Sequence, residues 1–404
     1  MPAPLPLPPR FLRLFQACAD AGGRAIAIGG AVRDHCRGEA PKDLDVEVHG
    51  IPPADLEVLL RRLGRVSEVG KSFGVYKLRL GGDEIDVSVP RRDTQGGTGH
   101  KSIAVVSDPF LGLREAARRR DLSINAIGWD PLTQTFEDPW DGLGDLDRRL
   151  LRAVDPRTFC EDPLRALRVA QFAGRFGFTV DPELHRLCAE MPLGDLPAER
   201  IWGEIEKLLM RSPRPSVGWD VAESTGMWAR AVPEWAGKGA RALDRVATAP
   251  VEGKPRRLAL MLAAACEGLE IGEVEAVLDR LNVHRVDGYR VREQAVALLT
   301  ADPAIHRGDD LLDLPTDEGI LRAAEGCDVE LLAALVGSPR LLERAAALGV
   351  SRGPLPALLG GKDLETFGMA PGPQMGATLR ALREEQLSGR VTTREGALGW
   401  LNAR

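Results

Sequence analysis

The hydrophobic pattern of the first 150 residues switches between helical and strand spacing, which predicts a mixed α+β domain. Residues 10–21, 31–36 and 53–63 have the spacing of helices, and the last of these carries an apolar stripe of leucines. Residues 24–28 read as a short strand, and residues 43–48 alternate strictly between polar and apolar side chains.

Two further alternating runs, Val75–Leu80 and Glu84–Val89, flank Gly81 and Gly82. A pair of glycines between alternating runs favours a tight turn, so these runs predict a β-hairpin. Residues 91–100 are rich in Arg, Gly and Thr and are predicted to form a mobile loop. The proline-rich start, residues 1–10, is predicted to be a flexible extended leader.

From about residue 160 the pattern predicts helices only, separated by turns that contain Gly or Pro. The predicted helices are 163–176, 199–210, 256–266, 271–281, 290–299, 331–335, 341–348 and 374–387. No fixed period runs through this part, so a solenoid is not predicted. We expect a compact mixed domain followed by a long helical arm.

Composition limits the class of protein. The chain has 404 residues, of which 44% are hydrophobic and 28% charged, and this excludes disorder throughout. The net charge of −6 means that nucleic acid, if bound, must meet a local basic patch.

The six cysteines are scattered and form no C-x-x-C pair, which argues against a disulfide framework or a zinc ribbon. The longest apolar run, residues 258–266, is too short to span a bilayer, and the start lacks the features of a signal peptide. We therefore expect a cytoplasmic protein without a membrane segment.

Acidic side chains share one face of two predicted strands. In the first strand Asp43, Asp45 and Glu47 alternate with apolar residues, and in the second strand Asp86 does so together with Glu84. If the strands share a sheet, these carboxylates converge, and such oxygen-rich clusters suit Mg²⁺. Two ions roughly 3.5–4 Å apart would form a phosphoryl-transfer site. An isolated Asp-x-Asp pair more often decorates the solvent side of a sheet, so this motif alone leaves both readings open.

The turn before these strands contains Gly29 and Gly30, where a predicted strand enters a predicted helix. Bare backbone N–H groups at such a turn can hold a phosphate, and Arg33 could add a guanidinium. The sequence is neither a P-loop nor G-x-G-x-x-G, so it predicts neither a Walker ATPase nor a dinucleotide fold.

Five motifs in order resemble the class II tRNA nucleotidyltransferase and bacterial poly(A) polymerase family, which belongs to the polymerase-β-like superfamily. They are Gly29-Gly30-Ala31-Val32-Arg33-Asp34, Asp43-Leu44-Asp45, Arg119-Arg120-Asp121-Leu122-Ser123-Ile124-Asn125-Ala126, Asp138-Pro139 with Gly142 and Asp145-Leu146, and Glu161-Asp162-Pro163-Leu164-Arg165-Ala166-Leu167-Arg168. The resemblance is strong over residues 24–212 and weak beyond.

The resemblance implies a polymerase-β-like nucleotidyltransferase head followed by an all-α neck, body and tail. We expect a leader and first helix in residues 1–23, the catalytic head in 24–152, a nucleotide-selecting neck in 153–212 and a tRNA-binding body and tail in 213–404. The implied reaction is template-independent addition of C, C and A to the 3′ end of tRNA from CTP and ATP.

The resemblance also implies roles for individual residues. Asp43 and Asp45 would hold two Mg²⁺ ions, with Mn²⁺ as an alternative, and Asp86 would help to activate the primer 3′-hydroxyl. The implied nucleotide-binding residues are Gly29, Gly30, Arg33, Arg120, Asp121, Asn125, Asp162, Arg165 and Arg168.

Asp162, Arg165 and Arg168 fall within about a third of the circumference of a helix. The family uses the Asp and the first Arg as a protein template for the incoming base. A carboxylate accepts from the exocyclic amine of C or A, whereas U and G present a carbonyl oxygen there. Asp162-Pro163 is equally the pattern of a helix cap followed by Pro at the first helical position, and Asp162 could do both.

The chain departs from the family pattern in places. Gln171 stands where members often carry a third Arg, and an acidic pair often seen before the Arg-Arg-Asp motif is replaced, which leaves a basic run at residues 118–120. None of the six histidines is followed by Asp, so an HD phosphohydrolase activity is not expected.

Rival functions remain at this stage. A poly(A) polymerase, a CC-only enzyme and an A-only enzyme share the motifs, although the long stretch between residues 91 and 118 favours full CCA addition. Residues 70–74 fit G-x-S-x-G, but the strand pattern after Ser72 argues against a serine hydrolase. Four tryptophans at 202, 219, 228 and 235 are expected to pack in the core or at a hinge and not to stack on bases. Arg256-Arg257 is expected to contact tRNA phosphates.

Overall fold

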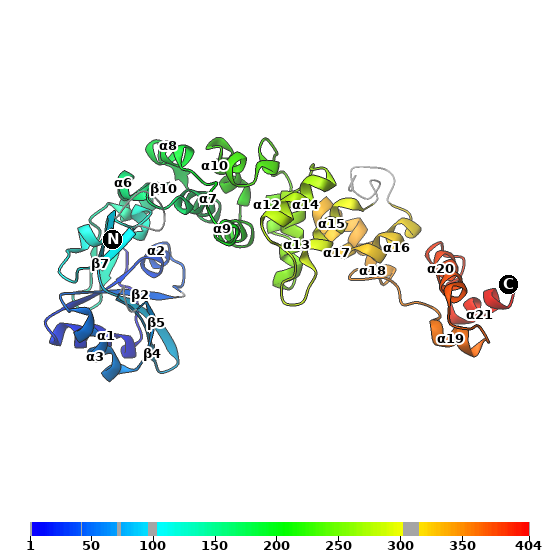
Figure 1. The fold of residues 1–404 in the computed structure, drawn as a ribbon, viewed down its shortest axis with the longest axis horizontal. Helices are drawn as coiled ribbons and strands as arrows, with labels where there is room; N and C mark the ends of the chain where they lie inside the picture. The colour runs from blue at the N-terminus through cyan, green and yellow to red at the C-terminus, as the bar shows by residue number, and fades with distance from the viewer. Residues whose placement is uncertain (1, 42, 71–73, 96–102, 302–314, 404) are drawn as a thin grey trace. The chain divides into compact units, whose positions relative to one another are not determined.

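A mixed sheet organises the first part of the chain. The computed structural model describes residues 2–41, 43–70, 74–95, 103–301 and 315–403. Seven strands form one sheet in the order β3-β4-β5-β2-β1-β8-β9. Figure 1 labels β2, β4 and β5 of this sheet. Their bounds are β1 Arg24–Ile28, β2 Leu44–His49, β3 Arg65–Gly70, β4 Val75–Leu80, β5 Asp83–Ser88, β8 Gly128–Asp130 and β9 Thr135–Glu137.

The strand register confirms the predicted hairpin and the sharing of one sheet by the acidic strands. β4 and β5 pair antiparallel around Gly81 and Gly82, which both have positive φ. β2 and β5 pair in parallel, and in that register Asp45 stands opposite Asp86. The two predicted carboxylate positions are therefore direct neighbours across the sheet.

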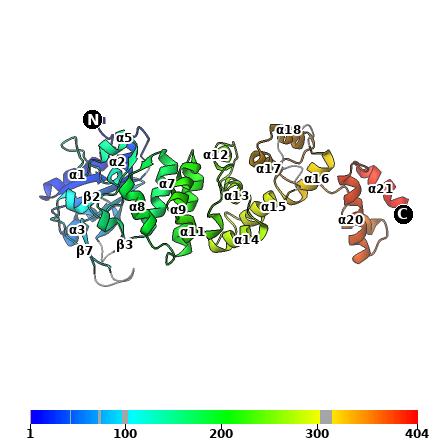
Figure 2. The same ribbon diagram turned by 90° about the horizontal axis from the view of Figure 1, so that it is seen from above.

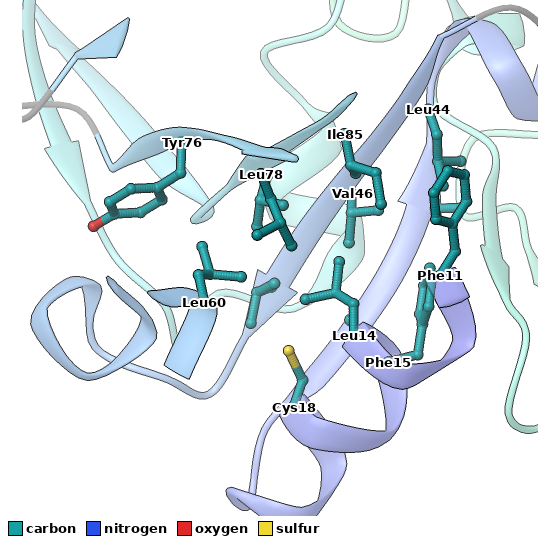
Figure 3. Packing of buried hydrophobic residues seen from close by; sticks show 14 of the residues in the cluster. Phe11, Leu14, Phe15, Cys18, Leu44, Val46, Leu60, Tyr76, Leu78 and Ile85 are labelled. Carbon is teal, nitrogen blue, oxygen red and sulfur yellow. The ribbon is translucent and has the colours of Figure 1, made fainter. Parts of the chain in front are cut away.

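One face of this sheet is covered by α1 (Pro9–Asp20) and α3 (Pro53–Leu63). Figure 3 shows side chains of both helices meeting the strands, with Leu14 and Phe15 from α1 beside Val46 and Leu44 of β2. Leu14, Phe15, Leu60, Leu78 and Ile85 are fully buried. The apolar half of the alternating strands thus forms the core, and the acidic half faces away from it.

Two expectations about this part are wrong. Residues 91–95 are not a loop: β6 (Arg91–Gln95) pairs antiparallel with β7 (Ile103–Ser107), and the rest of the expected loop lies outside the described residues. The leader is extended but not detached, because Leu5 is only 4% exposed and belongs to the head core. His35 Nε2 also lies 2.8 Å from the carbonyl oxygen of Ala3.

Short elements complete this part and lead into the helices. They are α2 Gly30–Cys36, α4 Leu113–Ala117, the 3₁₀ helix η2 Ser123–Asn125, α5 Gly142–Arg148, β10 Leu150–Leu151, α6 Pro156–Phe159, α7 Leu164–Phe176, β11 Thr179–Val180, α8 Pro182–Glu190, α9 Ala198–Arg211, α10 Pro215–Ser224 and α11 Met227–Ala231. Asp155 and Asp181 cap α6 and α8, each followed by Pro at the first helical position.

The remaining described residues form helices, as expected. They are the 3₁₀ helix η3 Pro233–Trp235, α12 Leu243–Ala247, α13 Lys254–Ala265, α14 Ile271–Arg280, α15 Val291–Thr300, α16 Asp317–Gly326, α17 Val329–Val336, α18 Pro339–Ala347, α19 Gly361–Thr366, α20 Pro373–Leu387 and α21 Arg394–Asn402. All eight predicted helices occur, with ends shifted by a few residues. The apolar helix α13 packs against α9, α12, α15 and α17, of which α12 and α15 are labelled near it in Figure 2. A small core lies among α19 to α21.

The contacts divide the chain into two compact units. The first comprises Met1–Leu196 and Val217–Ala231, and the second comprises Pro197–Ser216 and Val232–Arg404. Trp219 and Trp228 are core residues of the first unit and Trp235 of the second, as expected, whereas Trp202 on α9 is only half-buried.

Candidate active site

The Gly29-Gly30 turn lies directly over the acidic face of the sheet. Gly29 has a φ of +85°, a conformation that side chains rarely adopt. A Cβ placed on it would stand 3.1 Å from Arg120 Nη1 and 3.4 Å from Asp45 Oδ2. The turn therefore places bare backbone beside a carboxylate and a guanidinium, three features that the sequence predicts for one site.

Two other carboxylates, those of Asp86 and Asp43, act on Asp45. Burial raises its pKa, Arg120 counteracts this, and the nearby charges of Asp86 and Asp43 raise it further. The ionised form of Asp45 thus has less compensating positive charge than its burial demands. A cation close to these oxygens would stabilise it.

Asp86 lies beside Asp45 and is balanced by a lysine. Its Oδ1 is buried and forms an ion pair with Lys77 Nζ at 3.2 Å. Lys77 stands opposite Asp86 on β4 and also binds Glu84 at 2.7 Å. Sequence reasoning did not single out Lys77, although its place in the predicted hairpin, facing Asp86 across the turn, was the available signal.

These observations fit a divalent cation held by aspartate oxygens. Among the described residues no three acidic, His or Cys side chains are already arranged around one metal position. The fit therefore rests on the chemistry of Asp43, Asp45 and Asp86, two of them paired in register, and on the burial of Asp45, which raises its pKa.

Glu47, the third acid of the same strand, has a different environment. It is completely buried, with His49 Nε2 3.3 Å from Oε1 and Arg119 Nη2 3.5 Å from Oε2. Burial alone would raise its pKa, but His49, Arg120 and Arg119 outweigh burial and lower the pKa. Glu47 thus anchors Arg119 to the sheet.

One donor of the Arg120 guanidinium has no hydrogen-bond partner in the described part of the chain. Its Nε is buried and has no hydrogen-bond partner among the described residues, while Nη1 approaches Gly29. A buried donor without a partner is costly, so this group is well suited to an anionic ligand at the turn.

Arg33 belongs to a buried network behind the turn. It is 4% exposed, its Nη1 donates to Asn125 Oδ1 at 2.6 Å, and its Nε and Nη2 donate to Asp34 Oδ1. Asn125 in turn donates to Asp121 Oδ1 at 2.8 Å. The structure therefore places Arg33 and Asn125 against protein partners, whereas the resemblance implies contacts to the nucleotide.

Asp121 connects this network to α7. Arg168 Nε donates to its Oδ2 at 2.8 Å. Burial alone would raise the pKa of Asp121, but the charge of Arg168 and the hydrogen bonds from Asn125 and Arg168 lower it to about 2. Asp121 is therefore a stable anion that orients Asn125 and Arg168.

Aromatic rings strengthen the connection between α2 and α7. The guanidinium of Arg33 lies 5.2 Å from the ring of Phe172 and 5.0 Å from the ring of Phe176. Arg37 lies 3.9 Å from the Phe176 ring, and Arg175 donates to Asp34 Oδ2 at 3.2 Å. Because a guanidinium is attracted to the face of an aromatic ring, these contacts join two elements that are distant in sequence.

The start of α7 carries the expected template residues. Asp162 Oδ1 accepts from the backbone N–H of Leu164 at 3.1 Å, so the capping interpretation is confirmed. Arg165 donates to the carbonyl oxygens of Thr158 and Arg119. These bonds tie the template face to the segment that contains Arg120.

Other motif residues support the chain locally. Asp138 accepts from the N–H groups of Gly142 and Leu143 at 2.7 and 2.8 Å. A Cβ on Gly142 would stand 2.3 Å from the carbonyl oxygen of Ser123, so only glycine fits there. Asp145, fully buried, pairs with Arg148 and Arg152.

The rival features find less support. Ser72 lies outside the described residues, but the chain after Gly74 continues as strand β4 and not as the helix that a nucleophile elbow requires. Each of the six cysteines is free. In the described part of the chain, no helix combines the length and apolar character needed to cross a bilayer.

Comparison with known proteins places this geometry in a family. The model of the poly(A) polymerase head domain matches residues 25–152. The CCA-adding enzyme of Pseudomonas putida strain F1 is 36% identical over 295 residues, which cover 71% of this chain and 75% of that protein.

Solved structures agree over nearly the whole chain. The Bacillus stearothermophilus CCA-adding enzyme in complex with CTP matches with a TM-score of 0.71 at 26% identity and covers 98% of both chains. The Thermotoga maritima CCA-adding enzyme, solved with tRNA, has the same fold with a TM-score of 0.72 at 19% identity, and the match covers 98% of this chain and 96% of that one.

Proposed function

Because the chain belongs to the family of CCA-adding enzymes and is a nucleotidyltransferase, we propose that it adds C, C and A to the 3′ end of tRNA from CTP and ATP. The observation that carries this proposal is the pairing of Asp45 with Asp86 beside Gly29 and Arg120. That arrangement joins carboxylates, a bare backbone turn and a guanidinium at one place, as transfer from a nucleoside triphosphate requires.

Asp43, Asp45 and Asp86 have different roles in the proposed reaction. Asp43 and Asp45 would hold two Mg²⁺ ions, which when bound neutralise charge on the triphosphate and on the attacking oxygen. Asp86 stands next to Asp45 and would take the proton of the tRNA 3′-hydroxyl, so that the oxygen attacks the α-phosphorus and pyrophosphate leaves. Lys77 keeps Asp86 oriented when the hydroxyl is absent.

The turn and Arg120 would bind the triphosphate. The bare backbone at Gly29 and Gly30 allows close approach, and the unpaired Nε of Arg120 supplies a buried donor. Arg33, Asp121, Asn125 and Arg168 are positioning residues in this proposal, since their polar groups are committed to one another.

Asp162 and Arg165 would select the base. Asp162 is held at the start of α7 by its bond to Leu164, and Arg165 by two backbone carbonyls. A carboxylate fixed in this way accepts from the amine of C or A and repels the carbonyl oxygen of U or G. The substrates and the free cysteines favour a cytoplasmic enzyme.

One assay tests the proposal. A tRNA that lacks its CCA end is incubated with CTP, with ATP and with both, and the product lengths are read on a sequencing gel. We expect growth by three nucleotides only when both are present. With both nucleotides present, growth by two would instead indicate a CC-only enzyme and growth by one an A-only enzyme. A long ladder with ATP would indicate a poly(A) enzyme.

The matched variant is Asp45→Asn, which keeps the shape of the side chain and removes its charge. It should abolish addition and leave tRNA affinity unchanged, because the loss falls on the chemical step. Glu343→Gln, an exposed acid in α18, serves as the control and should extend tRNA normally. Near-normal addition by Asp45→Asn would refute the carboxylate assignment.

A further inference from the structure

A cavity of about 580 Å³ lies in the second unit, far along the chain from the carboxylates. It is formed by the loop before α12 and by the turn that follows α13. Three of its lining residues are basic, three are glycines and one is acidic: Lys238, Arg241, Arg245, Gly237, Gly239, Gly268 and Glu267. Figure 2 shows α12 and α13, the helices next to it.

The glycines leave backbone exposed at this cavity. Gly237 and Gly268 have φ values of +71° and +82°, and no heavy atom lies within 4 Å of the place where a Cβ would stand. The space beside them is therefore open, and the left-handed conformation at both positions disfavours a side chain. A ligand can approach the main chain here as closely as at the Gly29 turn.

The two arginines at the cavity differ from Arg256 and Arg257. Arg256 was expected from the sequence to contact tRNA, but its charge is used within the protein. It pairs with Asp328 at 2.7 Å and with Glu330 at 2.8 Å, and its side chain is 14% exposed. Arg257 donates to the carbonyl oxygen of Ala247. By contrast, in the described part of the chain no carboxylate forms an ion pair with Arg241 or Arg245.

The Arg245 side chain is fixed by a hydrogen bond within the protein and keeps further donors for a ligand. One of its terminal nitrogens donates to the carbonyl oxygen of Leu335, and its stem passes Gly337, whose added Cβ would stand 3.1 Å from Arg245 Cδ. This bond occupies one donor of a guanidinium that has five. The rest of the charge is available at the cavity without further loss of side-chain freedom.

We propose that this cavity binds a backbone phosphate of RNA and so holds the tRNA away from the site of addition. The inference rests on the proposed function for the identity of the RNA. Its chemistry rests on three cations, of which Arg241 and Arg245 are not neutralised, beside open glycine backbone. None of the seven lining residues is aromatic, so the cavity lacks the rings on which single-stranded nucleic acid commonly stacks its bases.

The test uses Lys238→Gln, Arg241→Gln and the double variant in the full-length chain. Affinity for tRNA lacking its CCA end is measured over a range of salt concentrations, together with kcat and KM for addition. We expect the slope of log affinity against log salt to fall by about 1 for each phosphate that a variant no longer binds. The KM for tRNA should rise, while kcat at saturating tRNA stays unchanged because the cavity takes no part in the chemical step.

Arg13→Gln is the control, since it removes one charge from an exposed arginine of α1, outside the part of the chain that is expected to bind tRNA. If the double variant has the same salt slope and KM as this control, the inference about the cavity is overturned. The unmodified chain tests the proposed function separately. If it adds no nucleotides to tRNA, the proposed function is wrong, whatever the binding measurements show.

A further arm distinguishes RNA from free nucleotide. Equilibrium dialysis with labelled ATP and CTP counts the nucleotides bound by each variant. Loss of one bound nucleotide in the double variant, with unchanged affinity for tRNA, would assign the cavity to free nucleotide and overturn the proposal. Thermal unfolding checks that the variants fold. If the double variant does not fold, the single variant Arg241→Gln, at an exposed residue, provides the test.

Discussion

Asp162 shows how one side chain can serve structure and selection together. Its Oδ1 accepts from the N–H of Leu164. Asn caps a helix about as well as Asp, whereas Ala caps poorly and costs about 1 kcal/mol. The two substitutions therefore separate the roles, since an amide keeps an acceptor for the backbone but adds a donor that a base carbonyl can use.

We predict that Asp162→Asn unfolds at the same urea concentration as the unmodified chain but incorporates U and G more readily. Asp162→Ala should be less stable and also less selective. Single-nucleotide incorporation and urea unfolding measure the two effects. Normal discrimination against U and G by Asp162→Asn would leave Asp162 with its capping role only.

At the scale of elements, α7 is joined to α2 by charge and by aromatic contact. Asp34 and Arg175 have side chains only 14% and 24% exposed, so their 3.2 Å ion pair is less screened than one on the surface. Arg186 and Glu190 on α8 form a comparable pair with side chains 58% and 62% exposed. Burial, and not the number of ion pairs, should decide how much each stabilises the fold.

We expect a double-mutant cycle of Asp34→Asn and Arg175→Gln to give a coupling energy of about 1 kcal/mol. The same cycle at Arg186 and Glu190 should give less than about 0.5 kcal/mol. Urea unfolding provides both values. A coupling at Asp34 and Arg175 no larger than at the exposed pair would show that the network does not anchor α7.

Elements with a strong local pattern could be predicted from sequence, and contacts between distant segments could not. The alternation of β2 and β5 and the apolar stripe of α3 predicted these elements within a residue or two. Strand β6 was missed because its Arg, Thr and Gln lack an apolar face, and pairing with β7 supplies the stabilisation instead. The docking of Leu5 was missed because prolines around it suggest an isolated extended segment.

The candidate site divides in the same way. Asp45, Asp86 and Gly29 were predicted together because a period of two and a strand-to-helix turn fix where they point. No sequence pattern indicated that Arg33 turns toward Asn125, or that Arg256 pairs with Asp328. Those outcomes depend on which partner tertiary folding brings near each guanidinium, and no local pattern encodes that.

The whole molecule is built from two units that do not follow the order of the chain. Val217–Ala231 belongs with residues 1–196, while the segment between them belongs with the other unit. Arg230 binds this returning segment to the first unit, because it donates to the carbonyl oxygens of Cys188 and Met191 near the end of α8, where His185 Nε2 also lies 3.1 Å from Ser224 Oγ. It also donates to Gly226 and Thr225 in its own segment, and burial lowers its pKa.

Arg230→Ala should therefore destabilise the first unit by about 2 kcal/mol, since partly buried carbonyls lose their donors. Hydrogen exchange should quicken in α8 and α11 and stay unchanged in α13 of the second unit. Arg280→Ala is the control, because Arg280 pairs with Glu234 while 45% exposed and lies in the second unit. An equal loss of protection in α8 and α13 would mean that the two units unfold as one, and that Arg230 does not act on the first unit alone.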